Sequence, residues 1–276
     1  MKKFTKVLAV LCAVMLVLSF AAGCSSSSTS GDAEDTTIVV GATPSPHAEL
    51  LEAARAELEE MGYTLEIKEF TDYILPNEAV ANGEIDANFF QHQPYLTDYN
   101  AQNGTDLVFA GVVHYEPMGI FAGKTASLAD LQEGAIVAVP NDTTNEARAL
   151  LLLEAQGLIT LKEGVGLEAT PLDIEENPLN LSFQELEAAA VSRSLADVDI
   201  AVINGNYALD AGLKIEDALA TETKDSEAAT TYANGICVLP ENVDSPKIQA
   251  LVKVLQGETI SKYIEENYNG AVVSMY

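Results

Sequence analysis

Residues 88–95 read Asn-Phe-Phe-Gln-His-Gln-Pro-Tyr, and this stretch predicts the corner around which the fold is built. Apolar and polar residues alternate up to it, as in a strand, and Pro94 suits the first turn of a following helix. In an open α/β sheet such a corner faces the ligand crevice. A single Phe or His there is commonly a packed structural residue. Phe90, His92 and Tyr95 together with several amides instead suit a ligand that is part apolar and part hydrogen-bonding.

The N-terminus has the pattern of a secretion signal. Lysines precede an apolar run over residues 7–22, which would span about 24 Å as a helix, less than the ~30 Å hydrocarbon core of a membrane. Small residues then precede Cys24, as in a bacterial lipobox, where the cysteine is acylated and becomes the new N-terminus. We therefore predict a signal peptide over residues 1–23 and lipidation of Cys24. An ordinary secretory leader cut near Ala22 is the alternative.

Composition limits what the rest of the chain can do. Residues 24–35 are rich in Ser and acidic residues without periodicity, which is typical of a flexible tether. The chain has 42 Asp and Glu against 14 Lys and Arg, a formal net charge of −28. This charge excludes nucleic acid as a partner, and we expect contact with the membrane only through the lipid. Cys237 is the one cysteine after the tether, so no disulfide is expected within the body.

Strand and helix patterns alternate through the body, which is typical of an α/β fold. Residues 161–182 lack periodicity and are expected to be irregular. Strands are predicted at residues 36–41, 65–70, 106–113, 118–122, 135–140, 198–203 and 230–239, with helices between them and two more after the last.

Residues 143–146 read Thr-Thr-Asn-Glu and fit a capping box, with Thr143 as the N-cap and Glu146 reaching back to it. Asn145 and Arg148 are three residues apart and therefore share a face at the start of this helix. A helix N-terminus favours anions, and an Arg there can hold a carboxylate with two parallel hydrogen bonds. The alternative is a solvent-exposed Arg148 paired with Glu146 or Glu52.

Two more polar side chains follow predicted strands. Tyr73 and Asn204 lie just past strand ends, where ligand contacts concentrate, although Tyr73 could pack on the surface and Asn204 could simply cap a helix. No catalytic motif is present, and His47, His92 and His114 are too far apart in sequence to indicate a local metal site. We therefore expect no enzyme activity, no catalytic residue, no cofactor and no metal.

Several segments, taken together and in order, resemble the methionine-binding lipoproteins of bacterial ABC importers (NlpA family, MetQ type). The resemblance runs from about residue 38 to the C-terminus. It rests on Phe70-Thr71-Asp72-Tyr73, Leu75-Pro76-Asn77-Glu78-Ala79, Asp86-Ala87-Asn88, Phe90-Gln91-His92, Pro94-Tyr95-Leu96, Val139-Pro140-Asn141-Asp142, Thr144-Asn145 with Arg148, Glu175 with Asn177-Pro178, and Ala201-Val202-Ile203-Asn204.

The resemblance implies a two-lobed, type II periplasmic-binding-protein-like α/β fold with a ligand cleft between the lobes. The lobes would be residues 36–113 with 236–276, and residues 114–235. The family pattern places Tyr73, Phe90, His92 and Tyr95 around the ligand side chain, Arg148 and Asn145 at its carboxylate, and Asn204 and Asn234 near its polar end. Asn234 is implied by the resemblance alone. A buried zwitterion needs partners for both charges, which we expect from Arg148 and amide oxygens.

The resemblance also implies the function. We expect a monomeric, lipid-anchored protein on the extracytoplasmic face of the cell membrane, passing L-methionine or a close analogue to an ABC permease and its ATPase. A methionine-containing dipeptide or another apolar amino acid is the first alternative ligand. A lipid-anchored hydrolase and a structural or adhesive lipoprotein are alternatives from other classes.

Overall fold

The computed structural model describes residues 35–223 and 227–276. The predicted signal peptide, Cys24 and the tether up to residue 34 lie outside the described residues, so their assignment stays a prediction. Residues 36–276 form one compact unit. Among the described helices, none combines the length and the hydropathy needed to cross a membrane.

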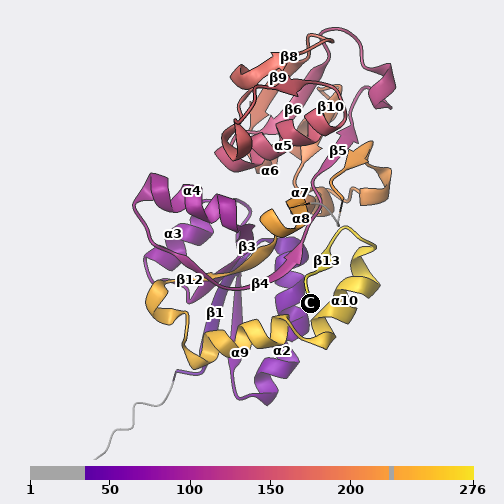
Figure 1. Ribbon diagram of the computed structural model, residues 1–276. Coiled ribbons are helices and arrows are strands. Elements are labelled where there is room, and N and C mark those ends of the chain that lie inside the picture. Colours follow the sequence, from indigo (N-terminus) through magenta and orange to yellow (C-terminus); the bar gives the residue numbers. More distant parts are fainter. Residues whose placement is uncertain (1–34, 224–226) are drawn as a thin grey trace, which may run out of the picture. The chain divides into compact units, whose positions relative to one another are not determined.

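A six-stranded sheet organises one half of this unit, in the order β13-β4-β12-β3-β1-β2 (Figure 1). Its strands are β1 (Thr37–Ala42), β2 (Thr64–Glu69), β3 (Ala87–His92), β4 (Val108–Tyr115), β12 (Asn234–Val238) and β13 (Val273–Ser274). β1 pairs in parallel with β2 and β3, whereas β12 runs antiparallel between β3 and β4. A strand from the C-terminal part of the chain thus lies beside the corner at residues 88–95.

A five-stranded sheet organises the other half, in the order β11-β5-β10-β6-β9. Its strands are β5 (Gly119–Ala122), β6 (Ile136–Pro140), β9 (Ser182–Leu186), β10 (Ile200–Ile203) and β11 (Ala220–Thr221). β6 pairs in parallel with β9 and β10, and β5 is antiparallel to β10 and β11. β7 (Thr160–Leu161) and β8 (Ile174–Glu176) form a separate small pair.

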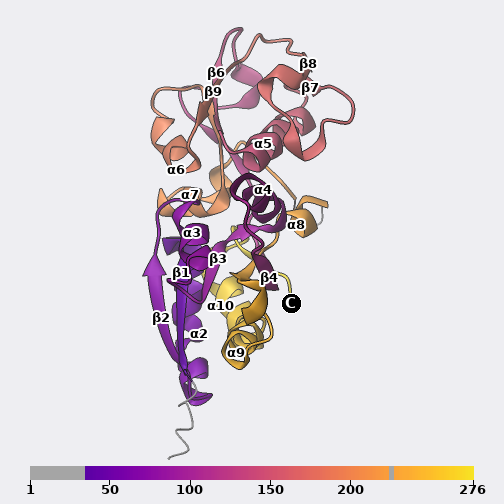
Figure 2. The same ribbon diagram turned by 90° about the vertical axis from the view of Figure 1, so that its left-hand side faces the viewer.

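Helices cover both faces of each sheet. The helices that matter for the site are α2 (Glu49–Glu60), α3 (Leu75–Ala81), α4 (Gln93–Asn103), α5 (Thr143–Ala155), α6 (Ala188–Val191), α7 (Gly205–Asp210), α8 (Glu227–Thr231), α9 (Pro246–Leu255) and α10 (Glu258–Tyr268). α2, α9 and α10 pack on one face of the six-stranded sheet, and α3 and α4 pack on the other (Figure 1). α5 and α6 lie on opposite sides of β6 and β9 (Figure 2).

The alternation of side chains along a strand explains this layering. In β12, Ile236 and Val238 join the core under α2, α9 and α10, while Cys237 between them joins the core under α3 and α4. Phe89 and Phe90 of β3 divide in the same way. Cys237 is fully buried, and burial raises the pKa of its thiol far above the usual value. Strands buried on both faces therefore need apolar residues at every position.

Two predicted elements differ from the structure. The strand predicted over residues 230–239 begins only at Asn234, because the preceding residues belong to helix α8, which ends at Thr231. Residues 161–182 were expected to be irregular, but they contain β8 and lead directly into β9. β9 is an edge strand of its sheet and carries polar residues at exposed positions, so it lacks the apolar run of a central strand.

Candidate functional site

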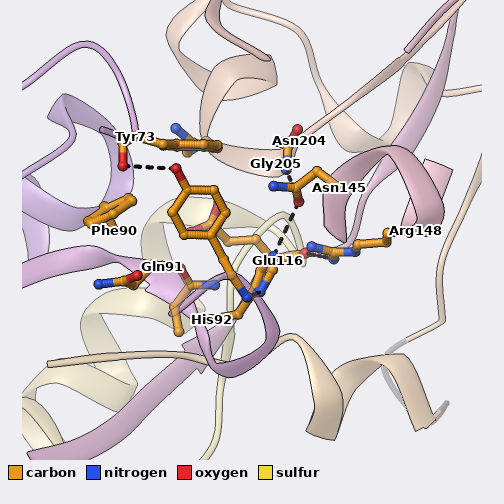
Figure 3. A pocket seen from close by; sticks show the side chains of 12 residues that line it. Tyr73, Phe90, Gln91, His92, Glu116, Asn145, Arg148, Asn204 and Gly205 are labelled. Carbon is orange, nitrogen blue, oxygen red and sulfur yellow. Dashed lines mark hydrogen bonds between the residues drawn. The ribbon is translucent and has the colours of Figure 1, made fainter. Parts of the chain in front are cut away.

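One cavity collects side chains from the strand ends of both sheets (Figure 3). Its lining consists of Tyr73, Phe90, Gln91, His92, Tyr95, Glu116, Asn145, Arg148, Asn204, Gly205, Asn206 and Asn234. All eight of the predicted ligand-binding residues are in this set. The sequence analysis missed Gln91, Glu116, Gly205 and Asn206. Gln91 lies between the predicted site residues Phe90 and His92, and Asn206 lies two residues after Asn204. Being an amide so close to a predicted site residue is the only local signal that either residue gives.

Aromatic rings form one end of the cavity. The Tyr73 ring lies 5.5 Å from the Phe90 ring and 5.7 Å from the Tyr95 ring, between centroids, and Phe90 and Tyr95 meet edge to face at 5.8 Å. The Tyr95 hydroxyl donates to the Tyr73 carbonyl at 3.0 Å, which holds the loop after β2 against helix α4. The three rings thus form an apolar slot whose shape is fixed by direct contacts.

His92 ends strand β3 and caps helix α4. Its Nδ1 accepts a hydrogen bond from the Tyr95 backbone N–H at 3.2 Å, so the ring proton resides on Nε2. Nε2 can then donate to Asn145 Oδ1, 3.2 Å away. Burial, reinforced by the charge of Arg148, lowers the pKa of His92 to about 3. His92 is therefore a neutral hydrogen-bond donor at physiological pH.

The start of helix α5 corrects the predicted capping box. The N-cap is Asp142 and not Thr143, since the Asp142 carboxylate accepts from the Asn145 backbone N–H at 3.0 Å. Glu146 does not reach back to the cap; burial and contact with Glu185 raise its pKa instead. Asp142 also accepts from Asn145 Nδ2 at 2.8 Å, and this second bond fixes the orientation of the Asn145 amide.

Asn145 joins the two sides of the cavity. With its amide nitrogen held by Asp142, its Oδ1 faces the cavity and accepts from Asn204 Nδ2 at 2.8 Å as well as from His92. Tyr73 forms a second bond across the cavity, to Asn206 Oδ1 at 2.5 Å. The remaining cavity has a volume of about 20 Å³, which is enough for a water molecule. An amino acid can enter only if these walls separate.

Arg148 lies in the wall of the cavity, on the side of Asn145 and away from Tyr73 and Phe90 (Figure 3). Only 4% of Arg148 is exposed, so the alternative of a solvent-exposed side chain is wrong. Its Nε and Nη2 donate to Glu222 at 2.8 and 2.6 Å, and Nη2 also donates to the Glu116 carbonyl at 2.8 Å. The guanidinium lies over the Tyr232 ring, 4.2 Å from its centroid.

Glu222 therefore changes the expected role of Arg148. Glu222 already accepts the two parallel hydrogen bonds that the guanidinium could give to a ligand carboxylate. Within the described chain, Nη1 is the one guanidinium nitrogen that makes no hydrogen bond. Glu222 also accepts from the Tyr115 hydroxyl at 2.7 Å and the Met118 N–H at 2.9 Å. Burial raises the pKa of Glu222, but the charge and hydrogen bonds of Arg148 outweigh burial, so this pKa lies below 4.5.

The fold also assembles a buried cluster that the sequence did not indicate. The nitrogen and oxygen atoms of His47, His114 and Glu116 lie within 4.8 Å of one another, a spacing that could accommodate a metal ion. A metal bound to His114 Nε2 would leave a proton on Nδ1, and this buried atom has no hydrogen-bond partner in the described part of the chain. A neutral His114 that donates from Nε2 to Glu116, 2.7 Å away, fits the geometry better.

Comparison with known proteins adds a second line of evidence. Residues 38–276 match the family described as NlpA lipoprotein. The methionine-binding lipoprotein MetQ of Bacillus subtilis is 41% identical over 267 residues, covering 95% of this chain and 96% of that protein. A solved nutrient binding protein from Burkholderia cenocepacia, bound to methionine, is 43% identical with a TM-score of 0.83, and covers 87% of this chain and 100% of its own.

A third relative is a solved periplasmic substrate-binding protein of an ABC transporter from Coxiella burnetii. It is 41% identical with a TM-score of 0.81, and the match covers 86% of this chain and 99% of that chain. These structures confirm the predicted two-lobed, type II periplasmic-binding-protein-like α/β fold. The relatives are binding proteins and not enzymes. The match over nearly the whole body and the identity above 40% show that this chain belongs to the NlpA lipoprotein family.

Proposed function

We propose that this protein is a lipid-anchored substrate-binding protein that captures free L-methionine and delivers it to an ABC importer. One observation carries the proposal: the cavity has an aromatic slot at one end and a buried cation with oriented amides at the other. A free amino acid with an apolar side chain needs both ends. The identity of 41% to a methionine-binding lipoprotein supports methionine as that amino acid.

The aromatic slot suits a thioether side chain. Tyr73, Phe90 and Tyr95 would enclose the methionine side chain, with His92 at the edge of the slot. Burial contributes about 0.8 kcal/mol per CH₂, and sulfur against aromatic rings contributes about 0.3–1.5 kcal/mol. A flexible unbranched chain can follow a slot whose walls are fixed, whereas a β-branched chain cannot.

The polar end would hold the main-chain groups. Arg148 would bind the carboxylate through Nη1, next to Asn145, while Asn204 and Asn234 complete this end of the cavity. A hydrogen bond to a charged group is worth about 1.5–3 kcal/mol. One such bond and the slot together give at most about 7 kcal/mol, so further hydrogen bonds to the charged groups of the ligand must supply the rest of the roughly −8 kcal/mol that a micromolar complex needs, before the cost of association.

The division into lobes explains how a ligand enters. We infer one lobe from residues 36–113 with 236–276 and another from residues 114–235. Tyr73 and His92 then belong to the first lobe, and their partners Asn206 and Asn145 to the second, so opening the lobes breaks these bonds. We further infer a monomer anchored through Cys24 to the extracytoplasmic face of the membrane, where it can meet the permease and its ATPase.

Mass spectrometry of any ligand retained by the purified protein, followed by calorimetric titration with L-methionine, tests the proposal. We expect methionine to be identified and to bind with micromolar or lower Kd, and valine to compete at least tenfold more weakly. Valine binding as tightly as methionine would contradict the thioether slot. Binding of glycyl-methionine alone would favour the dipeptide alternative, and turnover of ester or peptide substrates would favour a hydrolase.

A further inference from the structure

The cavity wall contains two charges of opposite sign. Among the twelve described residues that line it, Glu116 is the one carboxylate and Arg148 the one permanent cation. We expected amide oxygens to receive the ligand ammonium, so a buried carboxylate in the wall is an unexplained feature. Burying a carboxylate is costly unless it is paired. Glu116, which is only 5% exposed, therefore needs a reason to be there.

Two histidines hold the Glu116 carboxylate in place. Its Oε1 lies 2.7 Å from His114 Nε2 and 3.3 Å from His47 Nε2. The Thr43 hydroxyl lies 2.7 Å from His47 Nδ1 and can donate to it, which leaves the ring proton on Nε2, facing Glu116. Burial lowers the pKa of His47 to about 4 and that of His114 to about 3. Both rings are thus neutral, so neither cancels the charge of the carboxylate. His114 donates to Glu116, whereas His47 Nε2 makes its hydrogen bond with Asn234 Oδ1, 3.3 Å away, and lies against the carboxylate.

Within residues 35–223 and 227–276, the balance of charge at the polar end leaves Glu116 without a cation of its own. Arg148 makes its two hydrogen bonds to a carboxylate with Glu222, so these two charges compensate each other. The ammonium of a zwitterionic ligand would supply the missing positive charge. Arg148 Nη2 donates to the backbone carbonyl of Glu116, so the guanidinium and residue 116 are direct neighbours. An α-amino acid, whose ammonium and carboxylate groups are attached to the same carbon, requires such a neighbouring pair.

Gly205 shows that the position of Glu116 is closely fitted. A Cβ at residue 205 would lie 2.7 Å from Glu116 Cβ and 3.0 Å from Glu116 Oε2. Any larger residue would push the carboxylate out of the cavity wall, since contacts this short are not tolerated. The sequence Asn204-Gly205 after strand β10 thus makes room for Glu116.

We propose that Glu116 binds the α-ammonium group of the ligand, and that His47 and His114 are positioning residues that orient its carboxylate. The site then selects α-amino acids over analogues whose amine is absent or acylated. This inference rests on the proposed capture of a free amino acid, and it names the side chain that binds the ligand's amino group.

Calorimetric titration of three ligands tests the proposal: L-methionine, N-acetyl-L-methionine and 4-(methylthio)butanoate, which lacks the amine. We expect the wild-type protein to bind both analogues at least about 30-fold more weakly than methionine. Glu116→Gln should weaken methionine by at least about 30-fold and change the affinity for 4-(methylthio)butanoate by less than threefold. A matched control is Glu241→Gln, on the exposed surface away from the cavity.

The outcomes separate the two proposals. If the wild-type protein does not bind methionine, the proposed function fails. If it binds methionine but binds 4-(methylthio)butanoate within threefold of it, the role of Glu116 is overturned. An equal loss of both ligands in Glu116→Gln also overturns it, because that result indicates a structural effect. The wild-type comparison alone decides the question if the variant does not fold.

The positioning role has its own readout, the pH dependence of methionine affinity. His114→Leu removes the donor to Glu116, so the pKa of Glu116 rises and binding should weaken at a higher pH than in the wild type. His114→Gln retains an N–H donor and should restore the wild-type profile. The titratable groups that face Glu116 are His47, His114, Arg148, Tyr73, Asp210 and Tyr268. Superimposable profiles for the three proteins would contradict the positioning role.

Discussion

Replacing Arg148 with methionine should separate the effect of this side chain on folding from its effect on ligand binding. The side chains of Arg148 and Glu222 are 4% and 8% exposed and are joined by hydrogen bonds of 2.8 and 2.6 Å. Removing one partner of such a pair leaves a buried charge uncompensated, which costs about 3–5 kcal/mol. At about 2–4 °C per kcal/mol for a chain of this size, Tm should fall by about 6–20 °C.

The double variant Arg148→Met/Glu222→Gln provides the decisive comparison. It removes both charges, so most of the lost stability should return. Methionine binding should remain weakened in both variants, by about 10- to 150-fold for the loss of one charged hydrogen bond to the ligand carboxylate. Arg193→Met, at an exposed position, is the matched control and should leave both properties unchanged.

The pH dependence of folding stability independently tests whether the Arg148–Glu222 pair stabilises the fold. In the wild type the pKa of Glu222 lies below 4.5, because Arg148 outweighs the effect of burial. The pair therefore stabilises the fold above about pH 4.5, and this contribution is lost as pH falls through the folded pKa. In Arg148→Met the lowering effect of the Arg148 charge and hydrogen bonds is lost, while burial and the hydrogen bonds from Tyr115 and Met118 remain. The pKa of Glu222 therefore rises, and the destabilisation should grow as pH increases above about 4.5. Scanning calorimetry decides the question. The reasoning is wrong if the stability of Arg148→Met lies within about 1 kcal/mol of the wild type, or if the double variant is no more stable than Arg148→Met.

Three further predictions concern other parts of the site. Asp142→Ala should lower the free energy of unfolding in urea by about 0.5–2 kcal/mol because it removes the helix cap, whereas Thr143→Ala should lower it by less than about 0.5 kcal/mol. A larger loss in Thr143→Ala than in Asp142→Ala would support Thr143 as the N-cap. Tyr73→Phe removes the bond to Asn206 and should raise the Kd for methionine by about 2- to 13-fold; an unchanged Kd would show that this bond does not favour closure. The folded pKa of His47 is lowered to about 4 by burial, so the unfolded chain takes up this proton first as pH falls, and His47 alone should contribute about 1.4 kcal/mol per pH unit to the loss of stability between pH 6.5 and about 4. His47→Gln should reduce the slope of the profile by that amount, and an unchanged slope would contradict the assignment.

The sequence predicted the lining of the cavity well, for a physical reason. Strand ends in an α/β sheet meet at one edge, so polar and aromatic residues just past several strands are expected to converge. Tyr73, His92 and Asn204 were found in this way, and the cavity contains all three. Asn234 gave no such signal, because it begins its strand instead of ending it.

The electrostatic partners could not be predicted in the same way. Arg148 and Glu222 are 74 residues apart, and nothing in the local pattern of either residue indicates the other. Glu116 lies between two predicted strands, and its role depends on His47, which the fold brings close. Such pairings are set by tertiary contacts. The pattern at the start of a helix can therefore locate Arg148, but it does not show which of its N–H groups are left without a hydrogen-bond acceptor.

The errors in the elements are local and have local causes. Asp142 and Thr143 are adjacent, and both residue types cap helices, so the sequence alone does not decide between them. β9 was missed because exposed polar residues occupy three of its five positions at the edge of the sheet. The strand predicted over residues 230–239 is too long because the β-branched and small residues before Asn234 are compatible with a strand as well as with a helix.

The burial of Cys237 has a practical consequence. Thiol-directed dyes such as maleimides react with the exposed thiolate, and Cys237 offers neither exposure nor an accessible ionised form. In a protein whose leader is removed and whose Cys24 is acylated, a single cysteine introduced at an exposed residue such as Leu172 would be the one site of attachment. A fluorophore placed in this way can report movement of that region as substrate is added, without replacing the native cysteine.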